Sequence, residues 1–432
     1  PRGRVEQQNV FCLSVHRRIA HGRAGSPIVR RLLPYVFDSL PVMRLLLATQ
    51  DFPPDTGGIE TYASELAPRL ADRCERFLLV APDRPGADQV DASLDYPIHR
   101  LPIRPDLLAL RTLFHVPRLG WAEEFDAAFH LHWPTVYSSL LSRWLTGSPR
   151  RIAATVNGKD TVFNPFGGSA LASAYNSLRR TSLSSADQIL PYSRFLARQA
   201  RRLGVPSERI EIVPFGTDPD VFYPEEVPEL RRKFDADTRP IILSAGRLVP
   251  KKGFGTALRA LDDVVDTLPD VMLLIAGEGP ERERLEQLVR ERRLEDNVRF
   301  LGKIPHSQIR KYYNLADVFL MAGHRESDDI EGFGLVYLEA NACGTPTIGA
   351  RVGGVPDAVR DGETGLLVPP KDPTATAEAL IRLLTNPDLA ERLGKQGRRR
   401  VLEEANWEDI ADRLVEALGR SPNSSRAPEQ AP

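Results

Sequence analysis

Residues Gly323–Asp357 read GHRESDDIEGFGLVYLEANACGTPTIGARVGGVPD, and they join a buried strand to a helix through a glycine-rich loop. Two glutamates, Glu331 and Glu339, stand in this stretch with seven residues between them. Because a helix N-terminus carries unpaired backbone N–H groups and the positive end of the helix dipole, the start of this helix is expected to face a phosphate. The N–H groups concerned belong to Phe333, Gly334 and Leu335. Carboxylates accept hydrogen bonds from hydroxyl groups, so the stretch predicts a site for a phosphorylated sugar.

Buried strands and helices alternate on both sides of this stretch. In the first half, strands are expected at 45–48, 77–81, 127–132, 152–156, 188–191 and 210–213, and helices include 60–70 and 194–203. In the second half, strands are expected at 241–246, 271–276, 298–301, 318–321, 347–349 and 365–368, and helices include 255–267, 281–292, 306–314, 336–343 and 374–385. Such alternation is typical of parallel sheets with helices on both faces. The sequence therefore predicts an α/β protein with two doubly wound, Rossmann-like domains, whose ligands bind at the carboxyl ends of the strands.

The chain length and one break in the pattern predict the domain boundaries. With 432 residues, two hydrophobic cores are expected rather than one. Proline-rich, acidic text from Asp218 to Pro228 interrupts the alternation and indicates a linker. The expected parts are an N-terminal domain over 43–222, a linker over 223–238, a C-terminal domain over 239–405, a closing helix over 406–420 and a disordered tail over 421–432.

Residues 1–42 differ from the rest of the chain. They carry seven arginines against Glu6 and Asp38, and the first methionine is Met43, directly before the first expected strand. We therefore expect the fold to begin at Met43, with residues 1–42 as an extra arm outside it. An arginine-rich targeting peptide is the alternative, although the segment lacks a clean amphipathic period.

The composition is that of an ordinary soluble globular protein, with 42% hydrophobic and 27% charged residues and a formal net charge of −1. This balance gives no reason to expect nucleic acid as a partner. Cys12, Cys74 and Cys343 have no paired or metal-like spacing and indicate reduced thiols in the cytoplasm. No run approaches the about 18 apolar residues that cross a bilayer. Basic helical text at Arg179–Arg180 and 194–202 is compatible with peripheral contact with the inner face of a membrane, although a solvated basic face is the favoured interpretation.

A basic turn, Gly246-Arg-Leu-Val-Pro-Lys-Lys-Gly253, follows one buried strand and precedes a helix. Two fixed cations at such a place stabilise the negative charge that builds up on a departing diphosphate, without a metal. Arg247 offers a planar fork of donors, and Lys252 offers a point charge. Lys251 competes with Lys252 for that role, and a basic turn that only ends the strand is the plain alternative. No metal site is predicted, because Asp218-Pro-Asp220 fits a turn better than a metal-binding pair.

Three more loops at strand ends are suited to the close approach of a ligand. Their residues are Gly277 and Gly279, Ile304, and Gly57 and Gly58. Glycine lets the backbone approach a ligand without interference from a Cβ, although glycines after a strand are weak evidence alone. A dinucleotide-binding loop would carry Gly-x-Gly-x-x-Gly near Gly57, followed by an acid. That pattern is absent, which argues against an oxidoreductase.

Polar side chains also end two expected strands of the first domain. His130 and His132 point to the same side of their strand, because side chains alternate along it, so at most one lies at the carboxyl end. A lone histidine in a strand is usually a core residue, and we interpret His130 in this way and His132 as the site residue. Asn157 and Asp160 follow the next strand. An amide hydrogen-bonds a hydroxyl but cannot move a proton near neutral pH, so Asn157 is expected only to hold one.

Together these motifs closely resemble the retaining glycosyltransferases of family four, over roughly residues 43–418 and most tightly in the second domain. The resemblance implies the GT-B fold, in which two Rossmann-like domains face a central cleft. In that family the last helix crosses back onto the first domain, and Trp407–Leu418 is the matching segment.

The resemblance also implies a role for each candidate residue. Glu331 lies beside the transferred sugar, and Glu339 binds the ribose. Arg247 and Lys252 stabilise the departing diphosphate, and His132 faces the donor sugar. The other positions are carried over as groups, with Phe333, Gly334 and Leu335 at the phosphate, Gly277, Gly279 and Ile304 around the base, Gly57 and Gly58 at the diphosphate and acceptor, and Asn157 and Asp160 on the acceptor side. Many members have histidine where this chain has Asn157, which puts any proton-transfer role there in doubt.

The implied activity is metal-independent transfer of a hexose, with retention of configuration, from a nucleotide-diphosphate sugar to a lipid, glycan or small-molecule hydroxyl. No residue of the signature is an obvious nucleophile, so front-face attack, with the leaving phosphate helping to deprotonate the acceptor, is the working hypothesis. The form DDIEGFGLVYLEA looks most like GDP-mannose-dependent mannosyltransferases of the phosphatidylinositol mannoside type. The alternatives are UDP-glucose or UDP-N-acetylglucosamine as donor, a sugar-nucleotide epimerase, a phosphorylase of the same fold and an inactive carbohydrate-binding relative.

Overall fold

The structure, a computed structural model, describes residues 43–102, 112–113, 115–119, 124–158, 170–327 and 329–420. From Arg44 onward these residues belong to one compact unit. The predicted arm at 1–42, the predicted tail at 421–432 and the acceptor-side candidate Asp160 lie outside the described residues.

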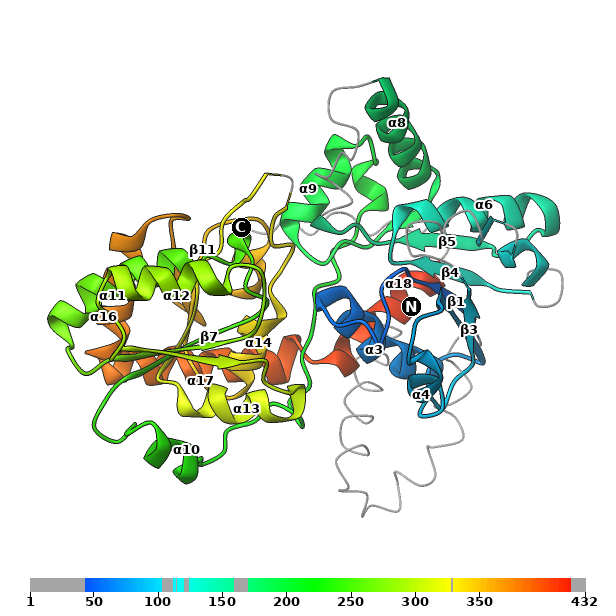
Figure 1. Cartoon of the computed structure of the whole chain (residues 1–432). Helices are drawn as coiled ribbons and strands as arrows, with labels where there is room; N and C mark the ends of the chain where they lie inside the picture. Colours follow the sequence, from blue (N-terminus) through cyan, green and yellow to red (C-terminus); the bar gives the residue numbers. More distant parts are fainter. Residues whose placement is uncertain are drawn as a thin grey trace, which may run out of the picture. The chain divides into compact units, whose positions relative to one another are not determined.

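The first half forms a six-stranded parallel sheet in the order β3-β2-β1-β4-β5-β6 (Figure 1). The strands are β1 Arg44–Ala48, β2 Arg76–Pro82, β3 Ile98–Leu101, β4 Ala127–His130, β5 Arg151–Ala154 and β6 Gln188–Ile189. The helices between and after them include α3 Gly58–Ala71, α4 Ala87–Asp91, α6 Trp133–Thr146, α8 Ala170–Ser185 and α9 Arg194–Arg202. Continuous apolar runs such as Leu45–Ala48 are buried, as expected for strands covered on both faces.

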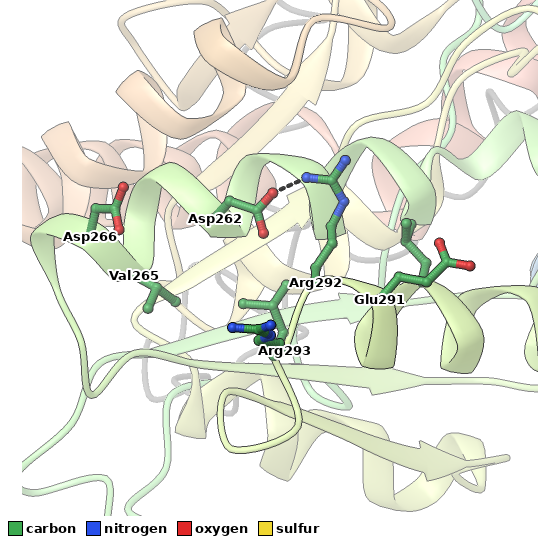
Figure 2. A pocket seen from close by; sticks show the side chains of 8 residues that line it. Asp262, Val265, Asp266, Glu291, Arg292 and Arg293 are labelled. Carbon is green, nitrogen blue, oxygen red and sulfur yellow. Dashed lines mark hydrogen bonds and ion pairs between the residues drawn. The ribbon is translucent and has the colours of Figure 1, made fainter.

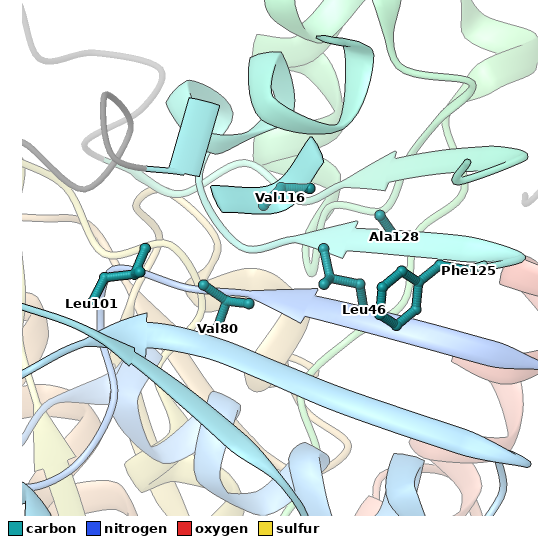
Figure 3. Close-up of a cluster of buried hydrophobic side chains, with 6 residues drawn as sticks. All are labelled: Leu46, Val80, Leu101, Val116, Phe125 and Ala128. Atoms are coloured by element: carbon teal, nitrogen blue, oxygen red, sulfur yellow. The ribbon is translucent and has the colours of Figure 1, made fainter. Parts of the chain in front are cut away.

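A cluster of buried hydrophobic side chains spans four neighbouring strands of this sheet (Figure 3). Its members are Leu46, Val80, Leu101, Val116, Phe125 and Ala128, each at most 3% exposed. Close packing of this kind transmits strain and leaves few voids, so the strands it joins keep fixed relative positions. The loops at the carboxyl ends of β1 and β4 therefore leave the sheet from a rigid base.

The second half repeats the same architecture with the order β12-β11-β10-β7-β8-β9, again all parallel. The strands are β7 Ile241–Ala245, β8 Met272–Ala276, β9 Val298–Gly302, β10 Val318–Met321, β11 Thr347–Ala350 and β12 Gly365–Val368. The helices are α10 Pro228–Lys233, α11 Phe254–Thr267, α12 Arg282–Glu291, α13 His306–Leu315, α14 Leu335–Ala342, α15 Val355–Ala358, α16 Pro373–Leu384, α17 Pro387–Glu404 and α18 Trp407–Gly419.

One strand prediction in the first half was wrong, and one strand was missed. The segment 210–213 runs beside β6 with backbone hydrogen bonds from Glu211 and Val213, but it adds only an isolated bridge and no strand. Pro214 follows directly and cannot donate to a ladder. The sixth strand is instead β3, an edge strand between two prolines whose His99 and Arg100 hide any hydrophobic pattern.

In each sheet the winding reverses between two neighbouring strands, β1 and β4 in the first and β7 and β10 in the second. Loops that leave such a pair diverge, and ligands bind there in doubly wound folds. Predicted site residues follow all four of these strands. They are Gly57 after β1, His132 after β4, Lys252 after β7 and Glu331 after β10.

The closing helix α18 packs against α3 of the first half. Three ion pairs fasten the two helices at 2.6–2.8 Å, namely Arg69–Glu408, Arg73–Glu408 and Arg73–Asp412. The ring of Trp407 lies 5.9 Å from the ring of Tyr62 and 6.2 Å from that of Phe215, measured between centroids. The chain thus ends its second sheet and returns to the first.

Candidate active site

The loops that follow β7 and β8 are fastened to each other through their backbones. The N–H of Gly246 donates to the carbonyl of Ala276 at 2.9 Å. Gly277 has a φ of 138°, and a Cβ there would lie 1.9 Å from the carbonyl oxygen of Gly246, so only glycine fits. A Cβ on Gly279 would lie 2.4 Å from the carbonyl oxygen of Leu248. The two glycines predicted to line the nucleotide site therefore also hold the basic turn in place.

The basic turn contacts the loop after β10 through two ion pairs. Nζ of Lys252 lies 2.6 Å from Oε2 of Glu331, and Nζ of Lys251 lies 2.8 Å from Oδ1 of Asp329. Side chains two residues apart in the acidic loop thus meet adjacent lysines. Of the two lysines, Lys252 is the one that contacts the predicted sugar-binding carboxylate. Long-range pairs of this kind have no local sequence signal, and Asp329 was missed for that reason.

These contacts keep Glu331 ionised. Burial alone would raise the pKa of its carboxyl group, but the charges of Lys252 and Lys251, together with hydrogen bonds from Lys252 and from the N–H of Phe333, outweigh burial and lower it. An ionised carboxylate accepts hydrogen bonds and cannot donate a proton. Glu331 is therefore suited to hold hydroxyl groups rather than to act as a general acid.

The helix that follows this loop begins at a position that only glycine fits. Gly334 is the residue before α14 and has a φ of 101°, and a Cβ there would lie 2.6 Å from the ring of Tyr337. No side chain of this residue can cap the helix, so the dipole end and the N–H of Leu335 stay available for an anion. The N–H of Phe333, by contrast, already donates a hydrogen bond to the carboxylate of Glu331.

Glu339 is buried on the second turn of α14, where it accepts a hydrogen bond from the hydroxyl of Tyr313 at 2.7 Å. Burial raises the pKa of Glu339, and the bond from Tyr313 opposes that effect. The structure gives this carboxylate a partner that the sequence did not reveal, because Tyr313 lies on another helix, α13. Its predicted contact with a ribose stays a prediction.

Arg247 is exposed just beyond the end of β7, and its guanidinium has no ion pair or hydrogen bond with any residue that the structure describes. Ile304 is half-buried in the loop after β9. Both positions border the loops already described, and their roles at the phosphates and at the base stay predictions.

In the first half, His132 ends the loop after β4 and precedes α6. Its ring is buried, with Nε2 3.1 Å from Oδ2 of Asp51, which stands in the loop after β1. Gly57 and Gly58 are exposed in that same loop, at the start of α3. The loops after β1 and β4 are therefore joined at the switch point of the first sheet.

The structure confirms that His130 is a core residue. Its side chain is fully buried, and its two ring nitrogens each lie 2.9 Å from a hydroxyl oxygen, of Thr135 and of Ser139. Burial lowers the pKa of His130 to about 3, so the ring is neutral at physiological pH.

Asn157 is buried behind His132 rather than exposed to an acceptor. Its amide nitrogen donates to the carbonyl of Leu131 at 2.9 Å and lies 3.3 Å from Nδ1 of His132. The hydroxyl of Tyr192 donates to its amide oxygen at 3.3 Å. The predicted contact of Asn157 with an acceptor hydroxyl is not tested by this placement, but the side chain is already engaged on both sides.

The loop that carries Glu331 also touches the first half of the chain. The ring of Phe333 lies 5.4 Å from the ring of Phe215, and a Cβ on Gly158 would lie 2.8 Å from the carbonyl oxygen of Ile330. Arg194 pairs with Asp357 at 2.6 Å. Residues from both sheets therefore meet at this loop.

Two further observations concern a hollow outside the candidate site and metal binding. A surface hollow between α11 and α12 is lined by Asp262, Asp266, Glu291, Arg292 and Arg293, with Asp262 and Arg292 paired (Figure 2). It lies at the C-terminal ends of both helices, at the amino end of the sheet, away from every predicted site residue. Among the described residues, no group of three His, Cys, Asp or Glu side chains is arranged to hold a metal ion.

Comparison with known proteins agrees with this geometry. The family model of glycosyl transferases group 1 matches residues 226–400, and that of the glycosyl transferase 4-like domain matches residues 57–216. A GDP-mannose-dependent alpha-(1-6)-phosphatidylinositol monomannoside mannosyltransferase of Mycolicibacterium smegmatis is 32% identical over 382 residues, which are 87% of this chain and 98% of the relative. The monoacylated-substrate enzyme of Corynebacterium glutamicum is 30% identical over 88% of this chain and 98% of its own.

Solved structures share the fold. HepE from Anabaena in complex with UDP has a TM-score of 0.74 at 18% identity, covering 87% of this chain and 99% of that one. Sucrose-phosphate synthase from Thermosynechococcus elongatus has a TM-score of 0.70 at 27% identity, covering 86% and 98%. With both halves matched by family models and the fold shared, the chain belongs to the glycosyl transferases group 1 family and is a glycosyltransferase with the GT-B fold.

Proposed function

We propose that this glycosyltransferase moves mannose from GDP-mannose to a hydroxyl group of a lipid-linked acceptor, with retention of configuration and without a metal. The observation that carries the proposal is the pair Lys252–Glu331, which joins a cation of the turn after β7 to a carboxylate of the loop after β10 at 2.6 Å. These are the two loops at the switch point of the second sheet, where doubly wound folds bind ligands.

The two members of the Lys252–Glu331 pair would bind different parts of the donor, a cation the diphosphate and a carboxylate the sugar. A diphosphate attracts Lys252 and the exposed Arg247, because both are cations of the turn after β7. When Lys252 turns to the phosphate, the carboxylate of Glu331 is released to accept hydrogen bonds from the sugar hydroxyls. The charge that develops on the leaving diphosphate is then stabilised by groups already in place.

The identity of the donor is supported by the relatives. Those from Mycolicibacterium and Corynebacterium are named as GDP-mannose-dependent and as acting on phosphatidylinositol mannosides, and each matches this chain over nearly its full length. Calorimetric titration with GDP and with UDP, in the presence of EDTA, tests this choice. Tighter binding of GDP supports the proposal, whereas tighter binding of UDP would overturn the donor and favour UDP-glucose or UDP-N-acetylglucosamine.

Front-face attack is part of the proposal, because Glu331 is assigned to the sugar hydroxyls and no residue of the donor signature is an obvious nucleophile. The proton of the acceptor hydroxyl passes to an oxygen of the leaving phosphate, and the new glycosidic bond forms on the face that the phosphate leaves. Mass spectrometry of the enzyme during turnover checks this route. A trapped glycosyl–enzyme adduct would contradict it.

A lipid-linked acceptor requires that the enzyme reach a membrane surface, and one face of the first half is suited to this. Within the described ranges, every helix is too short or too polar to span a bilayer. Helices α6 and α8 pack together, contain no acidic residue and expose four large apolar side chains. These are Trp144 at 80% exposure, Leu145 at 44%, Leu171 at 64% and Leu178 at 53%, which we call the α6–α8 face.

Cations lie near this face. Arg180 on α8 and Arg150 after α6 are exposed. Tryptophan prefers the headgroup level of a bilayer, and arginine is drawn to anionic lipid. We include peripheral binding of the α6–α8 face to an anionic membrane surface in the proposal, in place of the expectation that the basic text at Arg179–Arg180 and 194–202 alone supplies the contact.

A further inference from the structure

Three side chains form a chain of hydrogen bonds that ends at the candidate site residue His132. The hydroxyl of Tyr192 lies 3.3 Å from the amide oxygen of Asn157, and the amide nitrogen of Asn157 lies 3.3 Å from Nδ1 of His132. Asn157 and His132 are buried at 5% and 7% exposure, and Tyr192 at 3%. None of these contacts joins neighbours in sequence, so the arrangement depends on the fold.

The orientation of the Asn157 amide follows from its surroundings. Its Nδ2 lies 2.9 Å from the carbonyl oxygen of Leu131, which can only accept a hydrogen bond. If the amide were turned over, two acceptor oxygens would face each other in a buried place. The NH₂ group must therefore point to Leu131, and its second hydrogen points toward Nδ1 of His132.

The orientation of the amide in turn decides the state of the imidazole. A donor from Asn157 requires that Nδ1 of His132 accept, so Nδ1 carries no proton, and the proton of the neutral ring stands on Nε2. We propose that Asn157 is a positioning residue, which holds His132 as the neutral Nε2–H tautomer and aims a single N–H donor at the side of the ring where Asp51 lies. The inference rests on the proposed function only for its consequence in turnover.

The charged groups near the ring are both carboxylates, and the amide of Asn157 acts against them. Oδ2 of Asp51 lies 3.1 Å from Nε2 and alone would suit a neutral Nε2–H ring or a doubly protonated ring equally. Glu60 on α3 is also close enough to interact electrically with His132. Protonation of Nδ1 would bring N–H against N–H of Asn157, so the amide excludes the doubly protonated ring that two carboxylates would otherwise favour.

The tautomer gives His132 a defined task. A neutral Nε2–H ring donates a hydrogen bond to an oxygen of the donor sugar and brings no charge to it. The sugar oxygen would take the place beside Nε2 that Asp51 occupies at 3.1 Å. A ring with its proton on Nδ1 would instead present a lone pair on the same side and repel an oxygen that only accepts.

Nitrogen NMR of the full-length, ¹⁵N-histidine-labelled protein tests the tautomer directly. We expect one ring with an acceptor-type Nδ1 and a protonated Nε2, which is assigned to His132 because it disappears in His132→Asn. A His132 ring protonated on Nδ1 in the wild-type protein would overturn the inference, whatever the activity. The ring of His130 serves as an internal reference for the spectra. Its two nitrogens contact the hydroxyl groups of Thr135 and Ser139.

Substitution then tests the cause. In Asn157→Asp the carboxylate accepts from Nδ1, so the His132 signals should change to a ring protonated on Nδ1, while the His130 signals stay in place. We expect kcat to fall about 10- to 100-fold, as for other partners that orient a functional histidine, with the affinity for GDP changed less than about threefold. Unchanged His132 signals in this variant would show that Asn157 does not set the tautomer.

A milder variant guards against misfolding. Tyr192→Phe removes the hydroxyl that donates a hydrogen bond to the amide oxygen of Asn157. It leaves the carbonyl of Leu131, which still accepts from the amide nitrogen and orients the side chain. The tautomer should therefore persist, with a loss of kcat smaller than that of Asn157→Asp. If Tyr192→Phe inverted the tautomer, the amide would be oriented by Tyr192 and the argument from Leu131 would be wrong. Absence of transferase activity in the wild-type protein would refute the proposed function while leaving the tautomer to be read from the spectrum.

Discussion

Two adjacent lysines in the turn after β7 have different tasks in this structure. Lys252 pairs with Glu331, the predicted sugar ligand, whereas Lys251 pairs with Asp329 and fastens the loop that carries Glu331. Lys252→Ala should lower kcat about 10²- to 10³-fold, because it removes a fixed charge from the departing diphosphate. Lys251→Ala should cost about tenfold, because it only loosens a supporting contact. Steady-state kinetics of both variants measure the difference.

Asp329→Asn is the matched control for this prediction. It breaks the same supporting pair from the acidic side, so its loss of kcat should equal that of Lys251→Ala, and the double variant should lose no more than either single one. A loss in Lys251→Ala as large as that in Lys252→Ala would show that the two lysines do not have these different roles.

The pKa of Glu331 leads to a prediction about stability and pH. Its pKa is lower in the folded protein than its ordinary value of 4.5, so the ionised form stabilises the fold above that pH, and the contribution is lost as the pH falls through the folded value. The wild-type protein should therefore be more stable than Glu331→Gln at pH 7, and the difference should shrink below pH 4.5. Urea denaturation of both proteins across this pH range measures the difference in their unfolding free energies. A difference that grew toward low pH would mean that the pKa of Glu331 is raised instead.

At the scale of elements, Trp407 and several ion pairs join α18 to the first half. Trp407 is 3% exposed and lies near Tyr62 and Phe215, whereas Trp144 on α6 is 80% exposed. Trp407→Ala should therefore cost about 3–5 kcal/mol of unfolding free energy, and Trp144→Ala should stay within about 0.5 kcal/mol of the wild type. Urea denaturation compares them. Equal losses would contradict the packing of α18.

The α6–α8 face makes a separate prediction about membranes. Trp144→Ala should reduce binding to vesicles rich in anionic phospholipid roughly tenfold, because a large apolar side chain is no longer buried at the interface. Leu402→Ala on α17 is the matched control, since Leu402 is also exposed, at 46%, but lies in the other half of the chain. Sedimentation with vesicles measures binding. Equal effects of the two variants, or equal binding to neutral vesicles, would remove the α6–α8 face from the proposal, and concentration-dependent self-association lost in Trp144→Ala would assign it to a second copy.

At the scale of the whole molecule, the strand pattern was sufficient to predict two parallel doubly wound domains. The apolar runs of β1, β7 and β8 are long, buried on both faces and followed by glycine or polar loops, so their type was plain from the sequence. The edge of the first sheet was not predicted correctly, because β3 is short and polar and has no hydrophobic period. An edge strand packs against fewer neighbours, so its sequence is less constrained.

Parts of the candidate site could likewise be predicted from the sequence, and other parts could not. Residues in loops at strand ends, such as Lys252, Glu331 and His132, could be predicted because their neighbours in sequence form recognisable motifs. The contacts that Asp329, Tyr313 and Tyr192 make with Lys251, Glu339 and Asn157 were missed, since each of them joins residues that lie far apart in sequence. Asn157 was predicted as an acceptor-side residue, but its contact with His132 could be seen only in the fold.

The central claim is that the pair Lys252–Glu331 marks the donor site of a metal-independent transferase. Release of nucleotide from a panel of nucleotide sugars, measured in EDTA with and without lipid acceptor for the wild type and for Glu331→Ala, tests it most directly. We predict release of GDP from GDP-mannose alone, undiminished by EDTA, and a loss of at least about 100-fold in Glu331→Ala with only a modest loss of GDP affinity. Undiminished turnover in Glu331→Ala, or turnover only with added metal, would contradict the account.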